Sequence, residues 1–150
     1  MIVTALKLAN ASPNKPRQAD LKRAISTAYY ALFHAMAKDA ADMLVGVGPT
    51  RPDRAWAHAY RALQHGDARL ACEGVRNINF PSTIKTCADA FVALQQKRHD
   101  ADYDPDHRAL REDALSAIKL AEDAIRDLKA SAKRDRRAFA VQILMKKRKS

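Results

Sequence analysis

The sequence predicts an all-α protein, an antiparallel helical bundle with a basic helical extension at its C-terminal end. The 150 residues include only 4 glycines and 6 prolines, and a shortage of helix breakers in an alanine-rich chain favours long helices with short connections. Apolar residues recur at spacings of three and four along several segments, which is the period of one helix face. Strands are therefore not expected.

The length and the charge define the organisation of the chain. A chain of 150 residues has room for one domain, so we assign residues 1–130 to a helical bundle and residues 131–150 to an extension of the same domain. The net charge is +10, of which residues 129–150 carry +8. Such a tail binds nucleic acid or an acidic partner, or serves solubility alone.

Two helices are expected in the first third of the chain. A short helix over residues 2–10 precedes a loop that holds Pro13 and Pro16. A long helix then runs from about Arg17 to Leu44. Its expected core face consists of Leu21, Ile25, Ala28, Leu32, Met36, Ala40 and Met43.

In the middle of the chain the helical pattern is interrupted more often. Residues 46–52 contain two glycines and two prolines, after which Asp53 is expected to cap a helix carrying Trp56, Tyr60 and Leu63. Gly66 and Asp67 predict a second interruption. A further short helix is expected over residues 68–76, ahead of a turn at residues 77–81.

A long helix begins near Ser82, with Pro81 in its first turn. Its core stripe of Ile84, Ala88, Phe91 and either Leu94 or Gln95 continues into two charged residues, Arg98 and Asp102. Asp104 and Pro105 are expected to end this helix and to begin the next, Asp104 as cap and Pro105 as first residue. That last long helix runs to about Lys129 with these residues inside: Leu110, Ala114, Ala117, Ala121, Ala124 or Ile125, and Leu128.

The extension contains an apolar island, residues 139–145, between two basic clusters. Residues 133–137 are expected to continue the preceding helix into this island. The island packs either on a partner or second subunit, or back onto its own bundle.

The sequence also predicts where the protein resides and which cofactors it lacks. Cys72 and Cys87 are too few for a disulfide scaffold and have no metal-ligand spacing, so we interpret them as reduced and structural. No signal peptide and no apolar run of about 20 residues is found, which predicts a cytoplasmic protein without membrane contact. Neither a metal site nor any other cofactor is expected, because phosphate-binding glycine loops and paired acidic metal motifs are missing.

Two polar groups interrupt the apolar pattern. Arg23, Thr27, Tyr30 and His34 lie at spacings of four, three and four, so they form a stripe beside the core face of the long helix. Arg98 and Asp102 are four residues apart and are able to form an ion pair that caps the bundle end. Alternatively, Arg98 supplies positive charge for a phosphate, which suits its planar fork of donors.

Two segments of the chain together resemble the HEPN family. They are residues 23–35, which contain Ala28-Tyr29-Tyr30-Ala31, and residues 98–104, which contain Arg98 and Ala101-Asp102-Tyr103. These helical-bundle proteins are frequent in prokaryotic toxin-antitoxin and phage-defence systems. The resemblance covers roughly residues 17–128. It implies a homodimer in which two subunits bring together their motifs, each an Arg, a polar residue and a later His, for metal-independent RNA cleavage.

The HEPN motif is matched in part. Arg98 and His99 occupy its first two positions, whereas Tyr103 stands where the commonest spacing puts the motif His. RNA cleavage of this kind requires a base, a proton donor and positive charge on the phosphate. An imidazole titrates near pH 6.5 and a phenol near pH 10, so His99, or the more distant His107, would have to do the proton work.

The resulting hypothesis is a HEPN-like protein that binds or cleaves RNA in a toxin-antitoxin or defence system. Arg98, His99 and Tyr103 are the candidate catalytic residues, and the candidate substrate-binding residues are Arg23, Tyr30, His34 and Asp102. The alternative is a non-catalytic module that binds a nucleotide, an RNA or a partner such as a nucleotidyltransferase antitoxin. A third hypothesis is a helical adaptor that assembles through residues 131–145.

Overall fold

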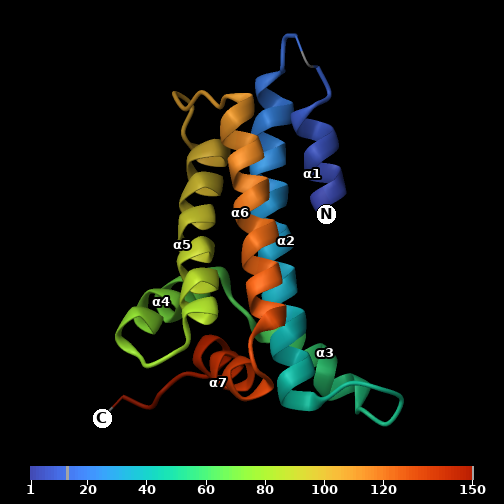
Figure 1. The fold of residues 1–150 in the computed structure, drawn as a ribbon, viewed down its shortest axis with the longest axis vertical. Helices are drawn as coiled ribbons and strands as arrows, with labels where there is room; N and C mark the ends of the chain where they lie inside the picture. Colours follow the sequence, from blue (N-terminus) through green and yellow to red (C-terminus); the bar gives the residue numbers. More distant parts are fainter. Residues whose placement is uncertain (13, 150) are drawn as a thin grey trace.

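The computed structural model describes residues 1–12 and 14–149 and is all-α in this part of the chain, as predicted (Figure 1). Pro13 of the predicted first loop lies outside the described residues. The helices are α1 (Ile2–Ala9), α2 (Gln18–Val45), α3 (Asp53–Ala62), α4 (His65–Gly74), α5 (Ser82–Tyr103), α6 (Arg111–Ala130) and α7 (Lys133–Leu144), with a 3₁₀ turn at Val75–Asn77.

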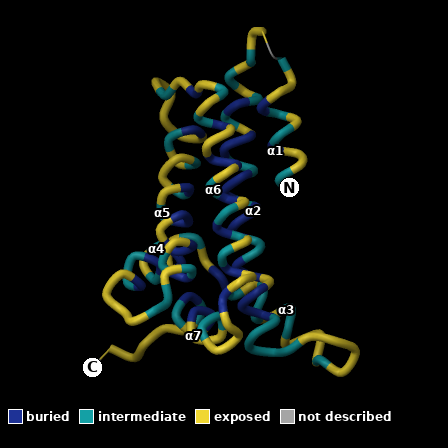
Figure 2. Tube along the Cα trace, viewed as in Figure 1, coloured by how far each residue is buried: buried dark blue, intermediate teal, exposed yellow. Residues whose placement is uncertain are grey.

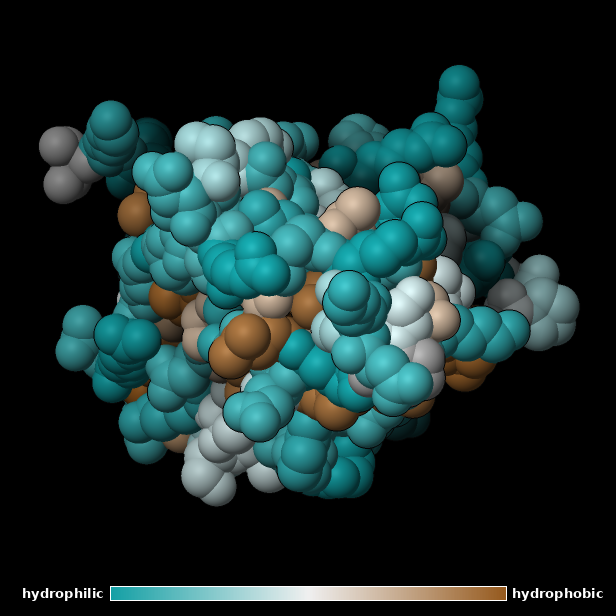
Figure 3. All heavy atoms as spheres, turned by 90° about the horizontal axis from the view of Figure 1, so that it is seen from above, coloured by the Kyte–Doolittle hydropathy of each residue, from teal (hydrophilic) through white to brown (hydrophobic). Residues whose placement is uncertain are grey.

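Three long helices, α2, α5 and α6, lie side by side along the length of the molecule (Figure 1). Their facing sides are buried, as the dark segments of Figure 2 show. Helix α1 packs against α2 and α6 at one end, and α3, α4 and α7 gather at the other. Seen from above, the end formed by α1 and the α5 to α6 connection is mostly hydrophilic, with hydrophobic residues in small separate groups (Figure 3).

The predicted core face of α2 is confirmed. Every residue of that face is buried except Met43, which is half-buried. The apolar stripe of α5 is buried from Ile84 to Leu94. Cys72 and Cys87 are both free thiols in the core, and burial raises the pKa of Cys87 to about 12. Both cysteines are therefore packing residues.

The prediction for the segment between α3 and α4 is wrong in its boundaries. The chain is extended at Leu63 and Gln64, and α4 already begins at His65, so Gly66 and Asp67 lie inside the first turn. An acidic residue is favourable there because of the helix dipole. Asp53 is likewise the first residue of α3 and not its cap, because its carboxylate accepts a hydrogen bond from Arg51 Nε at 3.1 Å.

The connection between α5 and α6 is longer than predicted. Helix α5 ends at Tyr103 as expected, but α6 begins at Arg111 and not at Pro105. The Asp104 carboxylate accepts the N–H of Asp106 at 3.0 Å in a tight turn. Leu110, predicted inside, is 58% exposed. Its backbone N–H donates to the Asp113 carboxylate at 2.7 Å, which caps the true start of α6.

Helix α7 folds back onto its own bundle. It does not continue α6, because the chain breaks at Ser131, whose hydroxyl donates to Thr83 Oγ1 at 2.7 Å. Phe139, Ala140 and Ile143 are buried, and α7 packs mainly on α2 and α4. Of the two alternatives for the apolar island, packing on the same chain is therefore confirmed.

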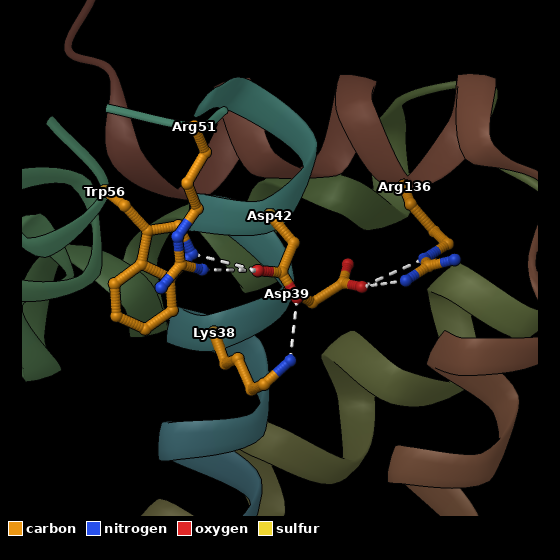
Figure 4. A network of polar contacts seen from close by, with 6 residues as sticks. All are labelled: Lys38, Asp39, Asp42, Arg51, Trp56 and Arg136. Carbon is orange, nitrogen blue, oxygen red and sulfur yellow. Dashed lines mark hydrogen bonds and ion pairs between the residues drawn. The ribbon is translucent and has the colours of Figure 1, made fainter. Parts of the chain in front are cut away.

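A polar network attaches α7 and α3 to α2 (Figure 4). Arg136 of α7 donates to the carboxylate of Asp39, which is buried. One turn further along α2, Asp42 accepts hydrogen bonds from Lys38 Nζ at 2.8 Å and Trp56 Nε1 at 2.9 Å. Burial opposes ionisation of Asp42, but these two hydrogen bonds and the positive charges nearby lower its pKa overall.

Candidate functional site

Arg98 lies near the C-terminal end of α5, enclosed by tyrosine rings. Its Cζ atom is 5.5 Å from the ring centroid of Tyr29, 5.4 Å from that of Tyr30 and 5.5 Å from that of Tyr103. Each ring face attracts the guanidinium electrostatically. The side chain is 17% exposed, so it is largely enclosed but not sealed from solvent.

Hydrogen bonds fix the orientation of Arg98. Its Nη2 donates to Tyr30 Oη at 3.1 Å and to Tyr103 Oη at 3.3 Å, and its Nε donates to Asp102 Oδ2 at 3.2 Å. The predicted ion pair with Asp102 is thus confirmed. The Asp102 carboxylate is held in turn by Ser26 Oγ of α2 at 2.7 and 2.8 Å. We call Ser26, Tyr30, Arg98, Asp102 and Tyr103 the Arg98 cluster.

One nitrogen of the guanidinium is unused. Within residues 1–12 and 14–149, Nη1 of Arg98 makes no hydrogen bond. Arginine presents five N–H donors in a planar fork, and a free N–H pair at its tip suits an oxyanion. The Arg98 cluster therefore holds the guanidinium in place without saturating it.

A solvent-open depression of about 330 Å³ adjoins Arg98 and is lined by Arg69 of α4 and by Gln95, Gln96, Arg98 and His99 of α5. His99 is exposed, and its ring centroid is 5.1 Å from that of Tyr103. Gln95 donates from Nε2 to the His65 carbonyl at 2.9 Å, whereas its Oε1 is buried without a hydrogen-bond partner among the described residues. The depression thus combines one imidazole with two arginines, each of which is paired with a carboxylate, Arg69 with Glu73 at 3.0 Å and Arg98 with Asp102.

His65 forms a second layer behind Arg98. Its ring stacks on Phe33 at 4.0 Å between centroids, and its Nδ1 is 2.6 Å from Tyr29 Oη. His65 is half-buried, and it contacts these aromatic side chains of α2 from the first position of α4. Burial, together with the positive charge of Arg98, lowers the pKa of His65, and burial raises the pKa of Tyr29 to about 12.

The predicted stripe on α2 is only partly assembled. Tyr30 reaches Arg98, while His34 turns to α3, where its Nδ1 is 2.8 Å from Tyr60 Oη. Arg23 is exposed, and Thr27 is half-buried; the side chain of neither forms a hydrogen bond within the described part of the chain. Arg23, Thr27 and His34 are therefore not part of the Arg98 cluster.

The geometry of His65 leads to a prediction on stability. Because its pKa is lower in the folded than in the unfolded chain, the unfolded chain binds more protons below about pH 6.5. The free energy of unfolding should therefore fall as the pH is lowered from about 7 towards 5.5. His65→Phe, which retains the stack on Phe33, should flatten this slope in urea titrations, whereas His58→Ala, at an exposed position, should leave it unchanged. If the free energy of unfolding depended on pH equally in both variants, His65 would not be the residue responsible for this dependence.

Three residues of the depression, Arg69, Gln95 and Gln96, were missed by sequence reasoning. The periodicity of α5 places Gln95 beside its core stripe, which is the one signal that could have found it. Arg69 comes from α4, whose position depends on tertiary packing that spacing does not encode.

Comparisons with protein-family models, with curated proteins and with solved structures give no significant match to this chain. HEPN membership thus stays a prediction from the motifs. In the described residues no cluster of three or more metal-ligating side chains occurs. None of the described helices has both the length and the apolar character that crossing a membrane requires.

Proposed function

We propose that this chain is a HEPN-like RNA-binding protein of a toxin-antitoxin or defence system, which holds an RNA phosphate at Arg98. Arg98 lines an open depression, and its Nη1 makes no hydrogen bond among the described residues; this is the observation that carries the proposal. A phosphate oxygen would bind this nitrogen, while the tyrosine rings keep the guanidinium oriented.

The neighbouring side chains suit a nucleotide attached to that phosphate. Arg69 lines the same depression and adds a second guanidinium, whose charge is partly offset by Glu73 at 3.0 Å. The volume of about 330 Å³ falls at the lower end of the range of small-ligand sites.

Cleavage would require a homodimer in which two Arg98 sites face each other. His99 would remove the proton of a ribose 2′-hydroxyl, whose oxygen would then attack the phosphorus and form a 2′,3′-cyclic phosphate. The leaving 5′-oxygen would take its proton from His99 of the partner subunit. Arg98 would stabilise the charge that develops on the phosphate oxygens.

Two observations favour a second, non-catalytic function. Asp102 neutralises part of the charge of Arg98 at 3.2 Å, and the imidazole of the exposed His99 makes no hydrogen bond within the described chain. A general base is usually oriented by another group. The same surface would then bind RNA, a nucleotide or a partner such as a nucleotidyltransferase antitoxin without cleaving it.

Both functions are tested by measuring binding and cleavage on the same variants, with fluorescently labelled single-stranded RNA and excess chelator. Arg98→Ala should weaken binding by at least about tenfold, since a charged hydrogen bond is lost. Arg98→Lys should restore part of it. His99→Ala should abolish cleavage while leaving binding nearly unchanged, because His99 is exposed and needed only for proton transfer.

The control is Arg126→Ala, which removes an exposed arginine of α6 outside the site. Thermal melting of each variant separates a lost site from a lost fold. Equal RNA affinity in Arg98→Ala and Arg126→Ala, with both proteins folded, would refute RNA binding at this site. If the wild-type chain bound RNA tightly but did not cleave it, the result would favour the non-catalytic function.

A further inference from the structure

A groove lies between α4 and the C-terminal end of α7, with a cavity volume of about 690 Å³. Figure 1 shows the C-terminal tail leaving α7 and running past α4. Two contacts fix the groove: Gln142 Nε2 donates to the Ala71 carbonyl at 3.2 Å, and Lys146 Nζ is 3.5 Å from Asp67 Oδ2. We call it the tail groove.

The tail groove combines exposed apolar side chains with positive charge. Leu70 is 68% exposed and Met145 is 57% exposed, although both are large hydrophobic residues. Lys147 and Lys149 also line the groove, and neither forms an ion pair within the described residues. Asp67 is the one acidic residue in the lining, and it is already paired with Lys146.

We infer that the tail groove binds an acidic amphipathic helix of a partner protein. The apolar face of that helix lies between Leu70 and Met145, and its carboxylates face Lys147 and Lys149. This inference is independent of the proposed RNA function, since it uses none of the residues of the Arg98 cluster.

The chemistry of the groove selects this partner. The helical part of the lining, from α4 and α7, offers no strand edge, and Leu70 with Met145 supplies two apolar anchors that suit the apolar stripe of a helix. An RNA backbone would use the lysines but would gain nothing from Leu70 and Met145, which are the exposed anchors that a protein interface buries. The groove is concave, so a flat lipid surface would not fill it.

The test uses two synthetic peptides of identical composition, measured by fluorescence anisotropy on the full chain. In the first, leucines recur at spacings of three and four among glutamates and alanines, so that they form one helix face. In the second, the same residues are permuted so that the leucines point in all directions. The first peptide should bind at least about tenfold more tightly, because only this peptide offers an apolar stripe.

Two double variants and a matched control locate the site. Leu70→Ser/Met145→Ser and Lys147→Glu/Lys149→Glu should each weaken binding of the first peptide by at least about tenfold. Leu115→Ser/Lys119→Glu changes an exposed apolar residue and a lysine on α6, and it should change affinity by less than about twofold.

Three results would overturn the inference. The first is equal binding of both peptides, which would indicate unspecific charge attraction. The second is weaker peptide binding in the Lys147→Glu/Lys149→Glu variant but not in the Leu70→Ser/Met145→Ser variant, accompanied by an equal loss of RNA affinity. This result would indicate that the tail binds nucleic acid. The third is failure of the first peptide to bind the wild-type chain even at low salt. None of them depends on whether Arg98 binds RNA.

Discussion

Replacement of Arg136 by alanine is expected to lower the free energy of unfolding by about 3 kcal/mol. Arg136 is the ion-pair partner of Asp39, whose side chain is only 9% exposed (Figure 4). Removing one member of such a pair leaves a buried carboxylate without compensation, and this costs more than the pair contributed. Urea denaturation followed by circular dichroism measures the loss.

The neighbouring residue provides a matched control for this effect. Arg137 is exposed and donates only to the Met43 carbonyl at 3.3 Å, so Arg137→Ala should cost less than about 1 kcal/mol. The double variant Asp39→Ala/Arg136→Ala contains no unpaired buried charge, and it should be less destabilised than the two single variants added together. Additive losses would show that the two side chains do not interact in solution.

Replacement of Phe91 by alanine is expected to cost about 3 to 5 kcal/mol, the range for truncating a buried aromatic side chain. Phe91 is completely buried on α5, with ring centroids 5.5 Å from Tyr29 and 6.4 Å from Phe33. Its removal opens a cavity between α5 and α2 behind the Arg98 site. The loss should appear as a lower denaturant midpoint at unchanged slope.

The residue that follows serves for comparison. Val92 is half-buried at the edge of the core, so Val92→Ala should cost about 1 kcal/mol. The stability loss of Phe91→Leu should lie between those of Phe91→Ala and Val92→Ala, because leucine fills part of the space that the phenylalanine ring occupies. If Phe91→Ala were no worse than Val92→Ala, the packing of α5 on α2 at this level would be disproved.

The long helices were predictable because they depend on local pattern. The spacing of Leu21, Ile25 and Ala28 along α2 defines a helix face whatever the partner, and all three are buried. The end of α5 at Tyr103 was likewise set by Pro105, which disfavours the helical conformation at the residue before it.

The start of α6 could not be predicted, because a long-range contact decides it. Gln18 of α2 donates from Nε2 to the Ala109 carbonyl at 2.7 Å and accepts the Ala109 N–H through Oε1 at 2.9 Å. This reciprocal pair ties the connection to a residue 91 positions earlier in the chain. Helix α6 then begins after Leu110, where Asp113 supplies the cap, and not at Pro105.

The candidate site was predictable to the same extent. The pairing of Arg98 with Asp102 follows from their spacing on one helix and is confirmed. Ser26, which holds Asp102, lies 76 residues away, and His65 reaches Tyr29 from another helix. Such contacts depend on how the helices pack. The sequence therefore predicted Arg98 as a site residue, but it did not predict which side chains of other helices surround it.

Helix α3 contains no buried residue and is held to α2 by the polar groups of two aromatic side chains, Trp56 to Asp42 and Tyr60 to His34. Its outer face, with Arg54, His58 and Arg61, contributes nothing to the core. Surface substitutions of this kind usually change stability by less than about 0.5 kcal/mol. Substitutions at these three positions are therefore expected to change the surface chemistry of the protein while the bundle and the Arg98 cluster stay as they are.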